Sequence, residues 1–179
     1  QYHGYTADVT RTFPANGKFT KEQKLVYDIV YEAQEAVFAI AKEGTPFRTI
    51  EDTAAAVVMR GLMRIGLISK PEEFRKYYPH GCSHYIGLDV HDKGDYLSVK
   101  ENEVITVEPG IYIPEGSNCD KKWWGIAVRI EDDVLIGKEK FELLSTLAPR
   151  KTEDIEKMIA DKSFVDGIKL PEPGKKKAF

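Results

Sequence analysis

The strongest constraint on the fold comes from a stretch in the second half of the chain, GIAVRIEDDVLI at residues 125–136. Its apolar and polar residues alternate, as side chains do on the two faces of a β-strand. One face carries Arg129 and Glu131, and we expect a turn at 132–133. The other face is apolar and consists of Ile126, Val128 and Ile130. Such an apolar face can pack on helices.

A second strand is predicted at residues 103–108, which alternate in the same way. Thr106 and Glu108 share its more polar face, and the Pro-Gly pair that follows ends the strand. Asp8 lies in a comparable stretch within residues 1–13, which we predict to be a strand or a hairpin. Three separate extended segments therefore each carry a carboxylate on their more polar side.

Three helices are predicted between and after these strands. The first begins at Thr20, which forms a capping-box arrangement with Gln23, and ends before Gly44. The second begins near Thr49 and the third at Thr152. Because helices and strands are segregated along the chain, we predict an α+β fold in which helices cover an antiparallel sheet.

The whole-chain properties favour one compact domain. The 179 residues suffice for a single core, which we assign to residues 1–160, followed by a C-terminal tail at 161–179. A net charge of -3 gives no reason to expect nucleic acid, and the longest apolar run, at 54–59, is too short for a bilayer. Cys82 and Cys119 share no metal-type spacing. We expect reduced thiols, a cytoplasmic location and no membrane partner.

The stretch HGCSHYIGLDVHD at residues 80–92 gathers three of the four histidines of the chain. His80 and His84 are four residues apart, but Gly81 stands where a helical zinc-protease motif requires glutamate. A loop is therefore expected here, and each histidine taken alone could be an ordinary exposed or hydrogen-bonded side chain.

The ionisable residues mean more as a set than singly. For Arg129 and Glu131 alone, a solvated ion pair on the sheet surface is the better interpretation. Glu108 favours function because it precedes Pro-Gly in an otherwise apolar run. Together, one imidazole and three carboxylates form a mostly oxygen ligand set, which suits Mn²⁺, Fe²⁺, Co²⁺ or Zn²⁺.

Four motifs carry a family resemblance, in order, over about the first 160 residues: GYTADVTRTFPANGKFT, PHGCSHYIGLDVHD, VITVEPGIYIP and GIAVRIEDDVLI. They resemble the C-terminal catalytic domain of aminopeptidase P, the Xaa-Pro aminopeptidase of the creatinase, prolidase and methionine aminopeptidase group. The resemblance implies the pita-bread fold, in which two related halves enclose a pair of metal ions. It also implies that this chain contains only the larger, C-terminal part of that domain.

The resemblance assigns roles to the ionisable residues. The implied metal ligands are Asp8, His84, Glu108 and Glu131. His80 and His91 resemble histidines that act in catalysis and bind substrate, and Arg129 resembles an arginine that orients the ligand carboxylates beside the substrate. The implied cofactors are two divalent ions, Mn²⁺ first, with Zn²⁺, Co²⁺ or Fe²⁺ as alternatives.

The implied reaction is hydrolysis of the bond before a proline in second position, by a hydroxide that bridges the two ions. Glu108 would carry the proton toward the proline nitrogen, and His91 would meet the negative charge on the carbonyl oxygen. The alternatives are a Xaa-Pro dipeptidase (prolidase), which shares the metal site, and a pita-bread module that only binds.

The resemblance also implies features outside this sequence. The family has another metal-binding aspartate about one hairpin before the position of Asp8, and an N-terminal domain that helps set oligomerisation. We therefore expect the chain to be part of a longer enzyme, with the N-terminal segment as a partner and a homo-oligomeric parent. The chain alone is expected to be inactive and to bind at most one ion tightly.

Overall fold

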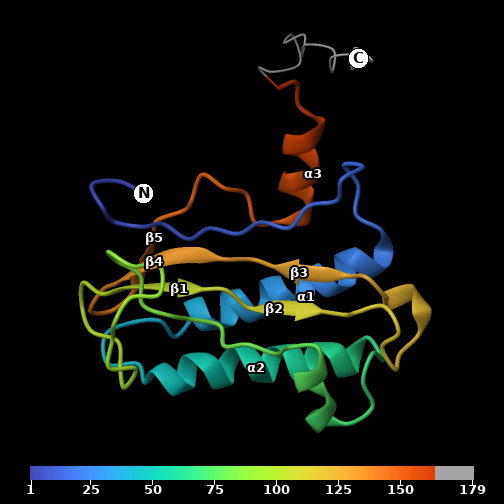
Figure 1. Ribbon diagram of the computed structural model, residues 1–179, viewed down its shortest axis with the longest axis horizontal. Helices are drawn as coiled ribbons and strands as arrows, with labels where there is room; N and C mark the ends of the chain where they lie inside the picture. The colour runs from blue at the N-terminus through green and yellow to red at the C-terminus, as the bar shows by residue number, and fades with distance from the viewer. Residues whose placement is uncertain (164–179) are drawn as a thin grey trace, which may run out of the picture.

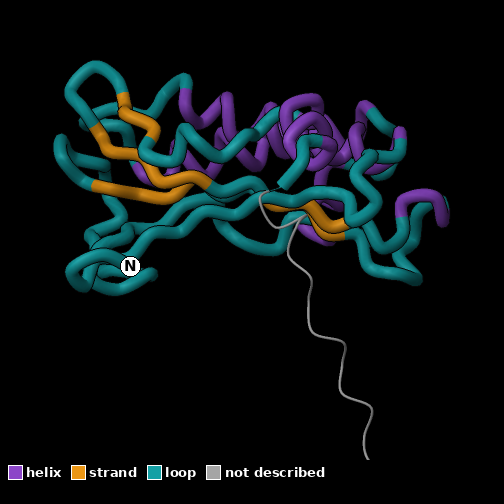
Figure 2. The backbone as a smooth tube through the Cα atoms, turned by 90° about the horizontal axis from the view of Figure 1, so that it is seen from above, coloured by secondary structure: helices purple, strands orange, loops and turns teal. Residues whose placement is uncertain are grey.

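The computed structural model describes residues 1–163 as two long helices packed on strands (Figure 1). Helices α1 (Lys21–Phe38) and α2 (Phe47–Arg64) pack against each other and lie along one side of the strands (Figure 2). The predicted capping box is confirmed, because the Thr20 hydroxyl accepts from the Gln23 N–H and the Gln23 side chain accepts from the Thr20 N–H. A Cβ added at Gly61 would lie 2.5 Å from Ile29, so this glycine permits the close approach of the helices.

The strands form two antiparallel ladders that share one register. β1 (Val104–Val107) pairs with β4 (Asp132–Ile136), which also pairs with β5 (Phe141–Leu143). β2 (Gly110–Tyr112) pairs with β3 (Ala127–Arg129). The two ladders are separated by residues 108–109 on one side and 130–131 on the other. If the register of either ladder is continued across this interruption, Glu108 lies opposite Glu131 and Pro109 lies opposite Ile130. The interruption follows from Pro109, which has no N–H to donate to the neighbouring strand.

Two further extended segments flank this ladder. Residues 82–86 run along the edge of β1, where Tyr85 bridges to Ile105. The N-terminal segment runs beside the strands on the side away from α2 (Figure 1), and Thr10 exchanges backbone hydrogen bonds with Glu131. The prediction of a regular strand or hairpin at residues 1–13 is wrong in this detail, because the segment pairs only through isolated bridges.

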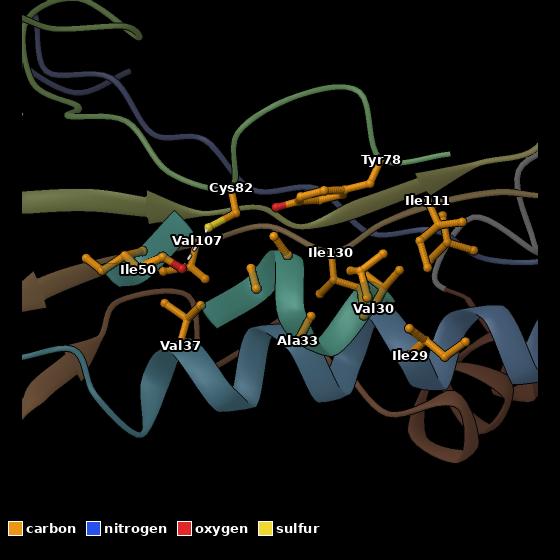
Figure 3. Close-up of a cluster of buried hydrophobic side chains, with 14 of the residues drawn as sticks. Ile29, Val30, Ala33, Val37, Ile50, Tyr78, Cys82, Val107, Ile111 and Ile130 are labelled. Atoms are coloured by element: carbon orange, nitrogen blue, oxygen red, sulfur yellow. Dashed lines mark hydrogen bonds between the residues drawn. The ribbon is translucent and has the colours of Figure 1, made fainter. Parts of the chain in front are cut away.

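The hydrophobic core fills the space between α1, α2 and the ladder (Figure 3). The contributing side chains are fully buried and include Ile29, Val30, Ala33 and Val37 of α1, Ile50 of α2, and Val107, Ile111 and Ile130 of the strand region. The strand face that alternation predicts as apolar therefore does pack on helices. Its opposite face is left to carry the polar side chains.

Asp132 and Asp133 form no turn, in contrast to the prediction, but begin β4 with both side chains buried. Arg11 Nη2 donates to Asp132 Oδ1 over 2.6 Å, and Gln34 Nε2 donates to Asp132 Oδ2 over 2.9 Å. Arg11 Nη1 also donates to the Glu131 carbonyl over 2.8 Å. These contacts need an extended backbone at 132–133, which explains why two consecutive aspartates do not bend the chain.

The remaining elements are a helix and two short 3₁₀ turns, η1 (Pro71–Lys76) and η2 (Lys121–Trp123). Helix α3 spans Thr152–Ala160, so Thr152 is a helical residue rather than the cap, and its hydroxyl accepts from the Lys24 ammonium instead. Helix α2 begins slightly earlier than predicted, after the extended Pro46. Most of the predicted tail, residues 164–179, lies outside the described residues.

Candidate metal centre

Four neighbouring extended segments bring the predicted ligands together. Glu108 and Glu131 lie opposite each other at the interruption of the ladder. His84 lies on residues 82–86, along one edge of that ladder, and Asp8 lies on the N-terminal segment along the other. The alternation of strand side chains turns all four toward one point, so residues far apart in sequence meet there.

His84 is held in the orientation that a metal ligand needs. Its Nδ1 lies 3.0 Å from the carbonyl oxygen of Tyr85, and because a carbonyl can only accept, Nδ1 carries the proton in this contact. Nε2 is buried and has no hydrogen-bond partner among residues 1–163. It faces carboxylate oxygens of Glu108 at 3.3 Å, Asp8 at 3.7 Å and Glu131 at 4.0 Å. These contacts leave Nε2 facing three carboxylates, and its lone pair is directed to the place where a cation would lie between them.

The two glutamates form a cross-strand pair, and two like charges there repel each other unless a cation or a bound proton neutralises one of them. Glu131 is 1% exposed, and this burial raises the pKa of its carboxyl group to about 7. The Thr10 hydroxyl donates to Glu131 Oε2 over 2.5 Å and opposes the shift, whereas the charges of Glu108 and Asp8 add to it. Arg129 Nε lies 3.5 Å from Glu131 Oε2 and offsets only part of this repulsion.

The spacing of these atoms is close to what a divalent ion needs. One ligand atom each from Asp8, His84 and Glu131 lies within 4.8 Å of the other two. Nitrogen and oxygen ligands lie about 2.1 Å from such an ion, so two ligands of one ion are at most about 4.2 Å apart. Small rotations of the carboxylates would bring the three atoms into that range. Glu108 approaches His84 but does not join this tight group.

The site opens into a cleft of about 430 Å³, within the usual range for ligand pockets. His80, His91 and Arg129 line it, and the rings of His91 and His84 are 4.3 Å apart between centroids, edge to face. His80 Nε2 lies 2.8 Å from the Tyr112 hydroxyl. The structure therefore brings all seven predicted site residues to one region, with four around a point and three on the walls.

Sequence reasoning missed Thr10, Tyr112 and Glu51, which support this site. Thr10 lies between Glu131 and Arg129, whose Nη2 donates to the Thr10 hydroxyl over 2.8 Å. Tyr112 and Thr10 each share a strand face with a predicted ligand, so alternation could have found them. Glu51 of α2 accepts from the Cys82 N–H over 2.9 Å and so fixes the loop before His84. No local signal in the sequence points to that long-range contact.

We expect the metal-free chain to lose stability as pH rises from about 4.5 to about 7. The unfolded Glu131 carboxyl titrates near 4.5 and the folded one at about 7, so between these values the folded state holds a proton that the unfolded state has lost. The shift corresponds to ~3 kcal/mol of unfolding free energy. For His84, burial acts to lower the pKa, but the close Glu108 carboxylate and other contacts outweigh it, and the net rise acts in the same direction.

Urea unfolding in chelator at pH 5 and pH 8 measures this effect. The Glu131→Gln variant is the matched control, because it is neutral at both pH values and should show a much weaker pH dependence. Greater stability at pH 8, or an equal pH dependence in both proteins, would contradict the assignment.

None of the helices within residues 1–163 is both long and apolar enough to cross a membrane. The predictions of a cytoplasmic location and of no nucleic-acid partner stay predictions.

Comparisons with known proteins agree with the fold and the site. Residues 1–138 match the model of metallopeptidase family M24. The chain is 36% identical to a Xaa-Pro aminopeptidase of Escherichia coli over 171 residues, which cover 89% of this chain and 39% of that protein. It is 41% identical to Xaa-Pro aminopeptidase 3 of Rattus norvegicus over 163 residues, which cover 86% of this chain and 32% of that protein. The chain thus spans well under half the length of these relatives.

Solved structures of aminopeptidases also resemble this chain in fold. Aminopeptidase PepP of Pseudomonas aeruginosa superposes with a TM-score of 0.84 at 38% identity, over 88% of this chain and 39% of that one. Proline aminopeptidase P II of Yersinia pestis superposes with a TM-score of 0.85 at 37% identity, over 89% of this chain and 39% of that one. The predicted resemblance and the pita-bread α+β fold are confirmed, and the chain belongs to metallopeptidase family M24.

Proposed function

We propose that the whole protein is a metal-dependent aminopeptidase that cleaves the bond between an N-terminal residue and a proline in second position. The observation that carries this proposal is the buried, unpartnered Nε2 of His84, which three carboxylates face beside an open cleft. The names of the relatives agree with this reaction. A dedicated pocket suits proline, because its ring occupies the place of the usual N–H and fixes the backbone.

The proposal includes the organisation of the protein. Residues 1–160 would form the C-terminal part of a catalytic domain and residues 161–179 a tail. Because the chain covers only 39% of its Escherichia coli relative, an N-terminal segment of the same protein would complete the site. We also propose that the whole protein is cytoplasmic and forms a homo-oligomer.

The metal ligands in this proposal are Asp8, His84, Glu108 and Glu131, of which the first two and Glu131 form the close group and Glu108 lies 3.3 Å from His84 Nε2. Mn²⁺ is our first choice, with Zn²⁺, Co²⁺ and Fe²⁺ as alternatives, because a set rich in carboxylates suits all four. When bound, a pair of such ions would activate water as a hydroxide nucleophile and polarise the scissile carbonyl.

The other residues of the cleft would bind the peptide and move its protons. His91 would donate a hydrogen bond to the carbonyl oxygen as negative charge develops on it. Glu108 would pass a proton to the proline nitrogen as the bond breaks. Arg129 would keep the carboxylates oriented, since its Nε lies 3.5 Å from Glu131 and 4.0 Å from Glu108. His80, which contacts the Tyr112 hydroxyl, would line the substrate pocket.

An assay of the whole protein with Mn²⁺ tests this function. We expect release of the first residue from pentapeptides with proline in second position. Turnover of Xaa-Pro dipeptides alone would assign the protein as a prolidase. Binding of Mn²⁺ without turnover of either substrate would leave a module that only binds.

For the 179-residue chain alone, we expect one tight Mn²⁺ site and negligible hydrolysis. Within residues 1–163, only one group of three or more candidate ligands lies together, and a second ion would share Asp8 and Glu131 with the first. Divalent ions of this group need four to six ligands, so a second site would be weak. Titration calorimetry with Mn²⁺ and a peptide assay on the same sample measure both quantities. Two tight sites together with turnover would contradict the expectation.

A further inference from the structure

Thr106 and Asp133 are directly opposite each other on β1 and β4, one step along the ladder from the two glutamates. Both are almost fully buried, at 0% and 6% exposed. Each side chain accepts a hydrogen bond from the backbone of a candidate ligand. Thr106 Oγ1 accepts from the His84 N–H over 3.1 Å, and Asp133 Oδ2 accepts from the Asp8 N–H over 3.0 Å. One cross-strand pair thus contacts both flanking segments of the metal centre.

Thr106 holds His84 at two points. Its N–H donates to the His84 carbonyl over 2.9 Å, and its hydroxyl accepts from the His84 N–H. Both contacts oppose sliding of the His84 backbone along β1 and its rotation away from that strand. Because the Nδ1 contact to Tyr85 fixes the ring, the position of Nε2 follows from the position of Thr106.

Asp133 extends the pairing of the N-terminal segment by two residues. Backbone hydrogen bonds join this segment to the ladder at Thr10 and Glu131, and the Asp133 carboxylate adds a contact at Asp8 itself. This contact is costly, because a buried carboxylate gives up its hydration. Asp133 Oδ1 has no partner among the described residues. This cost offsets the stability that the hydrogen bond adds, whereas its effect on the position of Asp8 serves the candidate site.

We propose that Thr106 and Asp133 are positioning residues that together fix the distance between the Asp8 carboxylate and the His84 imidazole. The backbone ladder between β1 and β4 holds the two side chains at a constant separation, and each then holds one ligand segment. This inference rests on the proposed metal site. Its consequence is that the affinity for the ion depends on two side chains that do not contact the ion.

Two matched pairs of variants test the inference by titration calorimetry with Mn²⁺. Thr106→Val keeps the shape of the side chain but removes the acceptor, and Thr106→Ser keeps the acceptor. Asp133→Ala removes both acceptor and charge, whereas Asp133→Asn removes the charge alone. We expect Thr106→Val and Asp133→Ala to weaken Mn²⁺ binding about tenfold or more relative to their partners, as supporting residues of metal ligands do.

The melting temperature without metal separates positioning from general stability. Asp133→Ala removes a carboxyl group that is costly to bury near Asp8 and Glu131, so we expect the metal-free melting temperature to stay the same or rise while affinity falls. Equal affinity within each pair would overturn the inference, as would an affinity loss matched by a loss of metal-free stability. A wild-type chain that binds no Mn²⁺ would refute the proposed metal site itself, which the variants cannot do.

Discussion

His84→Ala is expected to weaken Mn²⁺ binding by more than about a hundredfold, beyond the range usual for residues that only support a ligand. His84 supplies the one imidazole of the tight group, and its Nε2 faces Asp8, Glu108 and Glu131. Its removal leaves carboxylates that repel one another and no neutral ligand between them. Titration calorimetry of wild type and variant, both stripped of metal beforehand, measures the change in Kd.

His80→Ala is the matched control for this experiment. His80 lines the same cleft, but its two ring nitrogens contact the Gly81 carbonyl and the Tyr112 hydroxyl rather than the carboxylates. We expect its Mn²⁺ affinity to remain within a few-fold of wild type. Unchanged affinity in His84→Ala, or an equal loss in both variants, would contradict the assignment of His84 as the histidine ligand.

The fold could be predicted where local patterns are strong. Alternation marks the strands at 103–108 and 125–136 because one face of each packs on helices, and the capping box marks the start of α1. The prediction fails where tertiary contacts determine the backbone conformation. Two adjacent aspartates usually indicate a turn, but Arg11 and Gln34 hold Asp132 in an extended strand. Neither partner is near Asp132 in the sequence.

For the candidate site too, some residues could be predicted from the sequence and others could not. Its seven predicted residues come from motifs that keep their order and spacing, and the structure brings all seven together. Alternation places Thr106 on the face of Glu108 and Asp133 on the face of Glu131, but their partners, the His84 and Asp8 N–H groups, lie on other segments, and no local signal points to those contacts. The single register that joins the two ladders also has no local signal. It sets Glu108 opposite Glu131, which makes the pair part of the candidate metal centre.

His91→Ala is expected to lower kcat by about a hundredfold or more in the whole protein while leaving its metal content unchanged. The His91 ring stands edge to face with His84 on the wall of the cleft, and His91 is not a member of the tight ligand group. In the proposed reaction its N–H would donate to the carbonyl oxygen of the substrate from that position. A hydrogen bond that strengthens as charge develops lowers the barrier without holding the metal.

Steady-state kinetics on a pentapeptide with proline in second position, beside elemental analysis, separates the roles of the two histidines. His91→Gln keeps an N–H donor and should recover part of the lost kcat, which a purely structural histidine would not allow. A rise in KM with kcat unchanged would mean that His91 binds substrate and transition state equally. Loss of metal from His91→Ala would make it a ligand and refute the role. The two histidines should therefore respond oppositely, with metal lost first from His84→Ala and turnover lost first from His91→Ala.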